Sequence, residues 1–181
     1  MKVYVMLADG FEEIEALSAV DVLRRGNVVT VTVSVKEDKK VLSARKILVI
    51  ADSALSEVKV GKEDMIVIPG GSRGVENLKG SEALLRVLKE HQQQNGWLAA
   101  ICAGPTVPGK LGFYKGVRAT CYPGCEDELT GAVLSDKDVV VDRNFITSRG
   151  AGVSLPFAFT LLTLIKGTET ADKVKAAMLC K

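Results

Sequence analysis

Short apolar runs alternate with longer amphipathic segments along most of this 181-residue chain. The apolar runs have the length of strands, and the amphipathic segments repeat apolar residues three and four positions apart, as helices do. We predict strands at 3–7, 28–35, 65–68, 97–101, 117–120, 139–141 and 145–147, and helices at 12–25, 81–94, 153–165 and 168–178. For 41–50 the pattern leaves two interpretations, a hairpin-like pair or one long irregular strand.

The order of these elements predicts the fold class. The run from Val28 to Val35 is β-branched with little polar content, which is typical of a strand covered on both faces. Strands that alternate with helices favour a mostly parallel sheet with helices on both faces, an α/β three-layer sandwich. We expect one domain over residues 1–181, because a chain of this length buries a full core without staples.

Unusual residues follow three of the predicted strands. The segment 8–15 follows the first strand, Pro69-Gly70-Gly71 follows the strand at 65–68, and Cys102-Ala103-Gly104-Pro105 follows the strand at 97–101. The carboxyl ends of parallel strands meet at one edge of a sheet, and ligands bind at that edge. The sequence therefore predicts a functional site where these three segments converge.

Cys102 lies at a predicted elbow between a strand and a helix. Small residues and a proline follow the apolar run at 97–101, and proline is favoured in the first turn of a helix. Amide dipoles at a helix N-terminus stabilise a thiolate, which is the reactive form of cysteine. Two interpretations stay open, a reactive thiol and a small apolar core residue.

Glycines and glutamates supply the other candidate groups at this edge. Gly70 and Gly71 permit close backbone approach, and free amides beside a thiol would hold a developing oxyanion, although the same residues also make an ordinary turn. Glu12, Glu13 and Glu15 crowd a helix start, where a carboxylate is commonly a solvated charge or a cap. A glutamate turned inward beside Cys102 would have a raised pKa, but local sequence does not say which one turns inward.

The positions of the histidine and of the remaining cysteines argue against a cysteine–histidine pair and against a metal site. The one histidine, His91, lies in the polar end of a predicted helix and is expected to face solvent, so a cysteine–histidine pair has no local candidate. Cys121 and Cys125 are four residues apart without a second pair or a histidine, which predicts no metal site, and we expect no cofactor. Cys121 is either a packing residue or a thiol able to pair with Cys102.

Charge and hydropathy limit the partners and the compartment. The 24 basic and 22 acidic residues are scattered, which argues against a nucleic-acid-binding patch. No apolar run reaches the roughly 18 residues of a membrane span, and the chain opens directly on a strand rather than on a signal peptide. Four cysteines in such a chain favour free thiols, so we expect a cytoplasmic protein without a membrane partner.

Four motifs together resemble one known family. Ala-Asp-Gly-Phe-Glu-Glu-Ile-Glu at 8–15, Pro-Gly-Gly at 69–71, Ala-Ala-Ile-Cys-Ala-Gly-Pro-Thr at 99–106 and Thr-Ser-Arg-Gly at 147–150 resemble the ThiJ/PfpI superfamily, in the branch of the parkinsonism-associated protein deglycase. The similarity runs nearly end to end, with the motifs in the expected order. It implies a flavodoxin-like sheet and a homodimer.

The resemblance also implies roles for individual residues. It makes Cys102 an oxidation-sensitive nucleophile and Glu15 the inward glutamate that is hydrogen-bonded to the thiol. The backbone around Gly70 and Gly71, together with the amide of Ala103, would form an anion pocket.

Further positions of the resemblance concern the substrate. Arg25 and Arg45 lie where relatives carry arginines near a dimer-lined pocket, which makes them candidate substrate contacts. Many relatives have a histidine immediately before Pro123, whereas this chain has Tyr122. A tyrosine can hydrogen-bond a substrate oxygen, but its pKa near ~10 makes it a poor base at neutral pH.

The expected activity follows from these carried-over roles. The resemblance implies a cysteine-dependent enzyme of the glutathione-independent glyoxalase or deglycase type, which acts on a small aldehyde or a glycated substrate through Cys102 and Glu15. The alternative is a non-catalytic oxidative-stress sensor or chaperone-like protein with an oxidisable Cys102.

Overall fold

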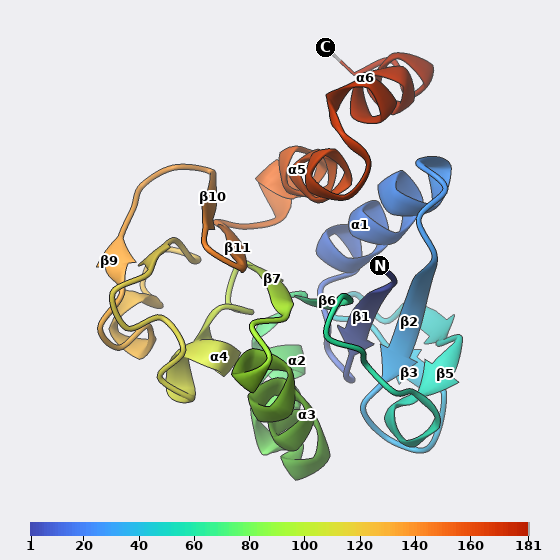
Figure 1. Ribbon diagram of the computed structural model, residues 1–181. Coiled ribbons are helices and arrows are strands. Elements are labelled where there is room, and N and C mark those ends of the chain that lie inside the picture. The colour runs from blue at the N-terminus through green and yellow to red at the C-terminus, as the bar shows by residue number, and fades with distance from the viewer. Residues whose placement is uncertain (181) are drawn as a thin grey trace.

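A seven-stranded sheet forms the middle layer of the protein (Figure 1). The computed structural model describes residues 1–180. In spatial order the strands are β10 (Val139–Asp142), β11 (Phe145–Ser148), β7 (Trp97–Ile101), β6 (Met65–Ile68), β1 (Val3–Leu7), β2 (Thr30–Ser34) and β5 (Ser53–Ala54). Neighbouring strands pair in parallel except β10, which is antiparallel to β11. The mostly parallel sheet predicted from the sequence is therefore confirmed.

Helices cover both faces of this sheet (Figure 1). One layer contains α1 (Glu13–Arg25), α5 (Ser154–Lys166) and α6 (Thr168–Ala177), and the other contains α2 (Ser72–Gly80), α3 (Glu82–Gln93) and α4 (Thr106–Lys110). Two small ribbons and three short 3₁₀ turns complete the chain: β3 (Lys40–Leu42) with β4 (Leu48–Ile50), β8 (Arg118–Ala119) with β9 (Val133–Leu134), η1 (Leu55–Glu57), η2 (Glu126–Glu128) and η3 (Ala151–Val153).

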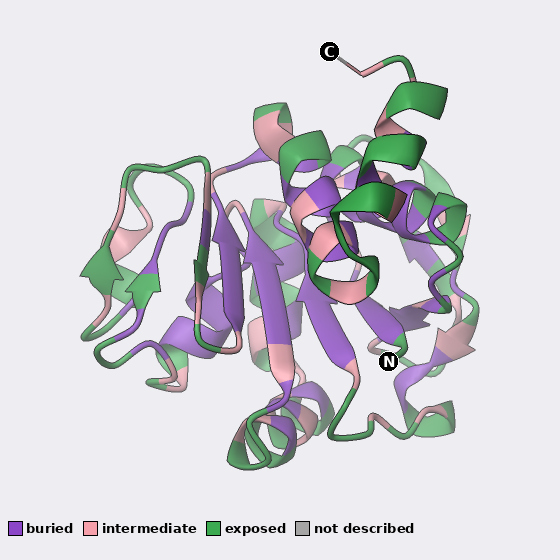
Figure 2. Ribbon diagram, turned by 45° about the horizontal axis from the view of Figure 1, so that its top comes forward, coloured by how far each residue is buried: buried purple, intermediate pink, exposed green. Residues whose placement is uncertain are grey.

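Side chains of the central strands alternate between the two helical layers. Along β1, Val3, Val5 and Leu7 pack in the cluster that contains α1 and α5, while Tyr4 and Met6 pack in the cluster under α2 and α3. Alternation is the natural period of a strand, so one apolar run supplies both cores. Figure 2 shows the resulting burial of the central strands along most of their length.

Several segments differ from the sequence prediction or resolve it. The strands β5 and β9 were not predicted, and the strand expected at 117–120 is β8, which lies outside the main sheet. Residues 41–50 form an antiparallel hairpin, in which Val41 lies opposite Val49, rather than one long strand. The helix α2 was not predicted, because its only large apolar residues are Val75 and Leu78, separated by polar positions and glycines. Two apolar residues on one turn do not make a periodic pattern.

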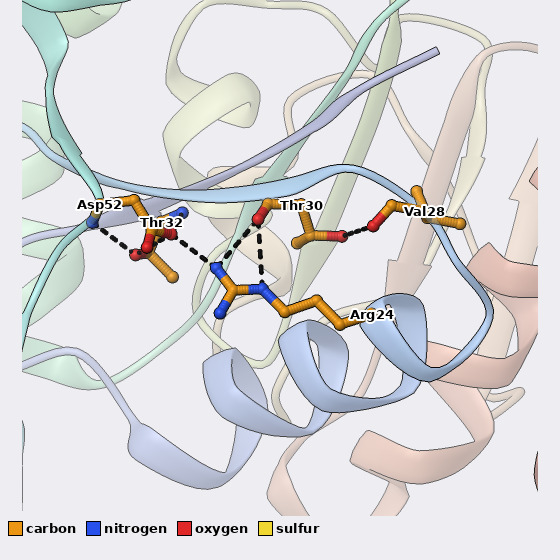
Figure 3. Close-up of polar contacts among 5 residues, drawn as sticks. All are labelled: Arg24, Val28, Thr30, Thr32 and Asp52. Carbon is orange, nitrogen blue, oxygen red and sulfur yellow. Dashed lines mark hydrogen bonds and ion pairs between the residues drawn. The ribbon is translucent and has the colours of Figure 1, made fainter.

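Polar contacts fix the end of α1 against the edge of the sheet (Figure 3). The Arg24 guanidinium donates to the Thr30 carbonyl at 3.0 Å and lies 2.6 Å from the Asp52 carboxylate. Asp52 in turn accepts hydrogen bonds from the backbone and hydroxyl of Thr32, each at 2.8 Å. At the other end, the Glu12 amide donates to the Gly70 carbonyl at 3.0 Å. The helix that carries Glu15 is therefore anchored at both ends.

The expectation that His91 faces solvent is wrong. The residue is 4% exposed, and its Nε2 lies 3.1 Å from the Trp97 carbonyl oxygen. Gly96 makes this possible, because a side chain there would collide with the imidazole. Burial lowers the pKa of His91, so the ring is held neutral in the core. It lies at the amino end of β7, at the opposite end of that strand from Cys102.

Two kinds of feature are absent from the described part of the chain, a membrane-spanning helix and a cluster of metal-binding side chains. None of its helices is long and apolar enough to cross a bilayer. Within residues 1–180, no three His, Cys, Asp or Glu side chains gather in a way that would hold a metal ion. All four cysteines are free thiols.

Candidate active site

The strand order brings the three predicted segments to one edge of the sheet. β1, β6 and β7 are neighbours, so the residues that follow them meet at their common carboxyl end. From β1 the chain runs to β2 on one side and later returns to β6 on the other side, which makes the β1–β6 boundary a topological switch point. Loops diverge there and leave space for a site.

Cys102 adopts a backbone conformation that is rare for a residue with a side chain. Its φ is +64°, in the left-handed region that costs an ordinary residue about 1–3 kcal/mol. Its amide donates to the Ser148 carbonyl at 2.9 Å, and its carbonyl accepts from the Tyr122 amide at 2.8 Å. These two hydrogen bonds from neighbouring segments hold the sharp turn that directs the thiol away from the strand.

Gly70 allows Glu15 and Cys102 to approach each other. Its amide donates to Glu15 Oε2 at 2.7 Å, and a Cβ atom at Gly70 would lie 2.6 Å from that oxygen and 2.7 Å from the Cys102 Cβ. Any larger residue would separate the carboxyl from the thiol. Glu12 caps α1 by accepting from the Glu15 amide at 2.8 Å, which fixes the helix turn that carries Glu15.

Glu15 is the buried member of the glutamate cluster that faces the thiol. The residue is 1% exposed, and its Oε1 accepts no hydrogen bond from any N–H or O–H group of residues 1–180. Burial raises the pKa of Glu15 from 4.5 to about 7, with a further contribution from the charge of Glu12. Hydrogen bonds from Cys102 and from the Gly70 amide favour the charged form and limit this rise. Glu13 is also buried, but its Oε2 lies 3.4 Å from the Arg45 amide instead.

The expectation that a helix terminus lowers the pKa of Cys102 is wrong. Burial, together with the neighbouring Glu15 charge, raises the pKa of the thiol to about 12. The helix α4 begins only at Thr106, four residues after the cysteine, so the thiol does not lie in its first turn. The backbone N–H groups of Ala103 and Gly71 near the sulfur act in the opposite direction and favour the thiolate.

These groups form a coupled acid pair. A thiolate and a carboxylate side by side in a half-buried site repel each other, so the pair keeps at least one proton near neutral pH. When the proton sits on Glu15, the Ala103 and Gly71 amides stabilise the sulfur anion and the repulsion is gone. The arrangement can therefore present a thiolate next to a protonated carboxylic acid.

Two further residues border the sulfur atom. A Cβ atom at Gly150 would lie 4.0 Å from Cys102 Sγ and 3.4 Å from the Tyr122 ring, so Gly150 lies alongside both. Tyr122 is 52% exposed, and its ring is on the open side of the site. The contacts of Ser148 and Gly150 with Cys102 were not predicted. The Thr-Ser-Arg-Gly motif at 147–150, at the end of β11, was the available signal, because it is one of the four motifs that resemble the family.

The two arginines are not at the thiol. Arg25 lies in the last turn of α1, about 15 Å along the helix axis from Glu15 by the usual rise per residue, and pairs with Asp21 at 2.8 Å. A contact from Arg25 to a substrate at Cys102 of the same chain is therefore excluded, because the helix runs away from the site. Arg45 lies closer, in the turn between β3 and β4, and lines a neighbouring cavity.

Cys121 belongs to the opposite layer from Cys102. Cys121 is buried in the cluster under α2 and α3, whereas Cys102 packs against the cluster that contains α1 and α5. Burial is also the largest cause of the raised pKa of Cys121, which reaches about 12. The thiol therefore packs in the core, and the structure does not bring it to the sulfur of Cys102.

Comparison with known proteins places this arrangement in a known group. The sequence model described as the DJ-1/PfpI family matches residues 1–164. The Parkinson disease protein 7 homolog of Danio rerio is 37% identical over 181 residues, which covers 98% of this chain and 96% of that protein. The glutathione-independent glyoxalase DJR-1.2 of Caenorhabditis elegans is 33% identical over 165 residues, which covers 90% of this chain and 87% of that protein.

A solved structure agrees with the sequence comparison. Oxidized DJ-1 from Toxoplasma gondii superposes with a TM-score of 0.93 at 35% identity, over 99% of this chain and 98% of that one. The similarity therefore covers the whole fold, including the flavodoxin-like sheet and the segments at its carboxyl edge.

Proposed function

The chain belongs to the DJ-1/PfpI family, and on that premise we propose that it is a glutathione-independent glyoxalase that converts small α-oxoaldehydes to hydroxy acids through Cys102 and Glu15. One observation carries the proposal. The buried Glu15 carboxyl, held by the Gly70 amide at 2.7 Å and with a pKa raised to about 7, lies beside the Cys102 thiol, and a Cβ atom at Gly70 would touch both. A nucleophile and a proton carrier are thus adjacent without any histidine. The C. elegans relative named a glutathione-independent glyoxalase supports the same chemistry.

The first step forms a carbon–sulfur bond. With methylglyoxal as substrate, the Cys102 thiolate attacks the aldehyde carbon, and Glu15 gives its proton to the aldehyde oxygen. The product is a neutral hemithioacetal beside a Glu15 carboxylate. The amides of Gly71 and Ala103, with the Gly70 backbone next to them, would stabilise the oxygen while it carries negative charge.

The second step moves a proton between the two substrate carbons. The Glu15 carboxylate removes the hydrogen from the former aldehyde carbon and returns a proton to the neighbouring carbon, while the hemithioacetal hydroxyl proton passes to the former ketone oxygen. The former aldehyde carbon is oxidised to a thioester and the ketone carbon is reduced to an alcohol, so no outside oxidant is needed. Water then hydrolyses the thioester, which releases lactate and restores the thiol.

Tyr122 and Arg45 have secondary roles in this proposal. Tyr122 is exposed and its ring lies alongside Gly150, which supports a role in which its hydroxyl would hydrogen-bond a substrate oxygen rather than act as a base. From the β3–β4 turn, Arg45 would attract those α-oxoaldehydes that also carry an anionic group.

Lactate production from methylglyoxal tests the proposal. We expect turnover by the wild type, and a loss of at least about a hundredfold in kcat/KM for Cys102→Ser and for Glu15→Gln. Cys180→Ser is the matched control, because this thiol lies after α6 and touches neither Glu15 nor the elbow. Absence of turnover by the wild type, or equal turnover by Cys102→Ser, would show that the glyoxalase assignment is wrong.

A second candidate function is an oxidation-responsive protein that does not turn over substrate. The observation that favours it is the same pair of sulfur-directed amides, which would hold a sulfinate oxygen as well as a substrate oxygen. Mass spectrometry after mild peroxide decides it. Oxygen addition concentrated on Cys102 supports the sensor, and equal addition to Cys102, Cys121, Cys125 and Cys180 contradicts it.

The setting in which the protein acts is also part of the proposal. We propose a homodimer built on the start of α1 and the β3–β4 hairpin, where Ile14, Leu48 and Ile50 expose apolar side chains. We also propose a cytoplasmic location, where four free thiols would stay reduced. Because the basic residues are scattered, the expected partner is a small-molecule aldehyde or a glycated substrate rather than a nucleic acid.

A further inference from the structure

A polar cavity of about 340 Å³ lies at the carboxyl edge of the sheet beside the candidate active site. It is bounded by the end of β1, by the turn between β3 and β4, and by the first turn of α2. Neither Cys102 nor Glu15 lines it, so it is a separate space. Gly71 connects the two places, because its amide faces the Cys102 sulfur while the next two residues, Ser72 and Arg73, line the cavity.

Three positive side chains from two distant segments surround this cavity. Arg45 and Lys46 come from the β3–β4 turn, and Arg73 comes from α2. None of their charged groups lies within 4.0 Å of a carboxylate of residues 1–180, whereas Arg24, Arg25 and several lysines elsewhere form such pairs. The cavity therefore concentrates positive charge that the described part of the chain does not neutralise.

The one acidic residue that lines the cavity is already compensated. Asp9 Oδ2 lies 2.7 Å from the Lys36 ammonium, and its Oδ1 accepts from the Leu42 amide at 2.9 Å. The hydrogen bonds and charge of Lys36, with a contribution from Arg73, lower the pKa of Asp9 despite the opposing effect of its burial. Nearby Glu13 reaches only the backbone amide of Arg45, at 3.4 Å. The net charge around the space is therefore positive.

Backbone and hydroxyl donors complete the lining. Gly71 is the N-cap of α2 and has no side chain to cap the helix. The amide of Gly74 donates to the Gly10 carbonyl, and the amide of Val75 donates to the Gly71 carbonyl. The amides of Ser72 and Arg73 have no acceptor within residues 1–180. The Ser72 hydroxyl lies at the same place. Together with the three charged side chains, these donors would match a ligand that has several acceptor oxygens.

The β3–β4 turn is fixed in a form that presents its cations. Lys46 has a φ of +68°, where glycine or asparagine is usual, and its amide donates to the Ser43 carbonyl at 3.1 Å. The Ser43 hydroxyl accepts from the Ile47 amide at 3.0 Å, which closes the turn. Arg45 and Lys46 are thereby held on a short, hydrogen-bonded loop next to α2.

We propose that this cavity binds the phosphate dianion of a small phosphorylated molecule. Guanidinium groups, an ammonium group and free amides are the donors that phosphate oxygens accept from. Asp9, the one carboxylate that lines the cavity, is paired with Lys36. The volume is at the lower end of the roughly 300–1,000 Å³ of small-molecule sites. It suits a phosphate with a few attached atoms rather than a dinucleotide. This site does not depend on the chemistry of Cys102.

Calorimetric titration of the full chain tests the site. Inorganic phosphate and glycerol phosphate are titrated separately at low salt, near pH 8. Both are mostly dianions there, because the second pKa is about 6 for a phosphate monoester and, although higher for inorganic phosphate, still below 8. We expect saturable binding that weakens about tenfold in Arg73→Gln and in Lys46→Gln, because each removes a charged donor. Arg86→Gln is the matched control, since this exposed arginine of α3 lines no part of the cavity and has the same charge change. We expect it to bind within about twofold of the wild type.

The two ligands also separate the source of the phosphate. Tighter binding of glycerol phosphate supports a phosphorylated metabolite, and equal binding supports free phosphate, both within the proposed chemistry. No saturable binding of either ligand, or an equal loss in Arg86→Gln, overturns the proposal. Thermal unfolding of each variant checks that an exposed substitution has left the fold intact.

Discussion

Glu15 and Cys102 act as one titrating unit, and this sets the expected pH dependence of the proposed reaction. With both groups protonated the thiol is a weak nucleophile, and loss of one proton gives the reactive pair. We therefore expect kcat/KM for methylglyoxal to rise about tenfold per pH unit in acid and to level off above an apparent pKa of about 7, which belongs to the pair. A pH series with purified enzyme measures it. A flat profile across neutral pH would contradict the shared-proton mechanism.

The same raised pKa predicts how stability changes with pH. Because the pKa of Glu15 is about 7 in the folded protein and 4.5 ordinarily, the native state binds more protons than the unfolded state between these values. The free energy of unfolding therefore decreases as pH rises across that window. Glu15→Gln has no carboxyl to ionise and lacks this penalty. We therefore expect its free energy of unfolding to increase by roughly 2–3 kcal/mol relative to that of the wild type as the pH is raised from mildly acidic to mildly alkaline.

Urea unfolding of both proteins across this pH range measures the Glu15 effect. Glu90→Gln, an exposed substitution on α3, is the matched control and should track the wild type. If the difference between Glu15→Gln and the wild type stays constant with pH, the carboxyl is not the group that titrates.

At the scale of one element, α2 depends on how closely its backbone approaches the loop after β1. A Cβ atom at Gly74 would lie 2.7 Å from the Phe11 backbone and 2.8 Å from that of Gly10, and backbone cannot move aside as a side chain can. We expect Gly74→Ala to destabilise the protein by about 1–3 kcal/mol, because the helix must shift. The shift would also displace Gly70 and Gly71, which precede the helix.

Gly80 provides a control on the same helix. No atom lies within 4 Å of a Cβ built at Gly80, so Gly80→Ala should be neutral or stabilise by up to about 1 kcal/mol, because alanine favours helix more than glycine does. Denaturant unfolding of the two variants measures the contrast. Equal effects at both positions would mean that close approach at Gly74 does not position α2.

At the scale of the whole molecule, the apolar side chains at the start of α1 and on β4 predict association. Ile14 is 55% exposed and Leu48 is 58% exposed, which favours burial against a second copy. We expect light scattering to give twice the chain mass of 19.3 kDa for the wild type, and the monomer mass for Ile14→Lys and Leu48→Lys.

Val133→Lys is the control for association. Val133 is similarly exposed but lies on β9, away from α1 and β4. This variant should remain a dimer. A monomeric wild type, or dissociation of Val133→Lys to the same extent, would contradict the proposed interface.

Several features were determined by the sequence itself. The longer strands and most helices were predictable because their apolar periodicity lies within the residues that form them, whereas the two-residue strands β5 and β9 were not. The elbow at Cys102 and the glycines at 70 and 71 were predictable for a similar reason, since turn chemistry depends on adjacent residues. The edge at which they meet followed from the rule for parallel strands, and the strand order confirms it.

Other features were decided only by the tertiary structure. Local sequence did not separate Glu15 from Glu12 and Glu13, because the contact with Gly70 joins residues 55 positions apart. The polar surroundings of His91 in the chain did not reveal that Gly96 leaves room to bury its ring. The sequence predicted a lowered pKa for Cys102, whereas the pKa is raised. Burial raises it, and so does Glu15, which is distant in the sequence but adjacent in the fold. Periodicity and turns are local properties, whereas burial and electrostatics depend on which distant segments the fold brings together.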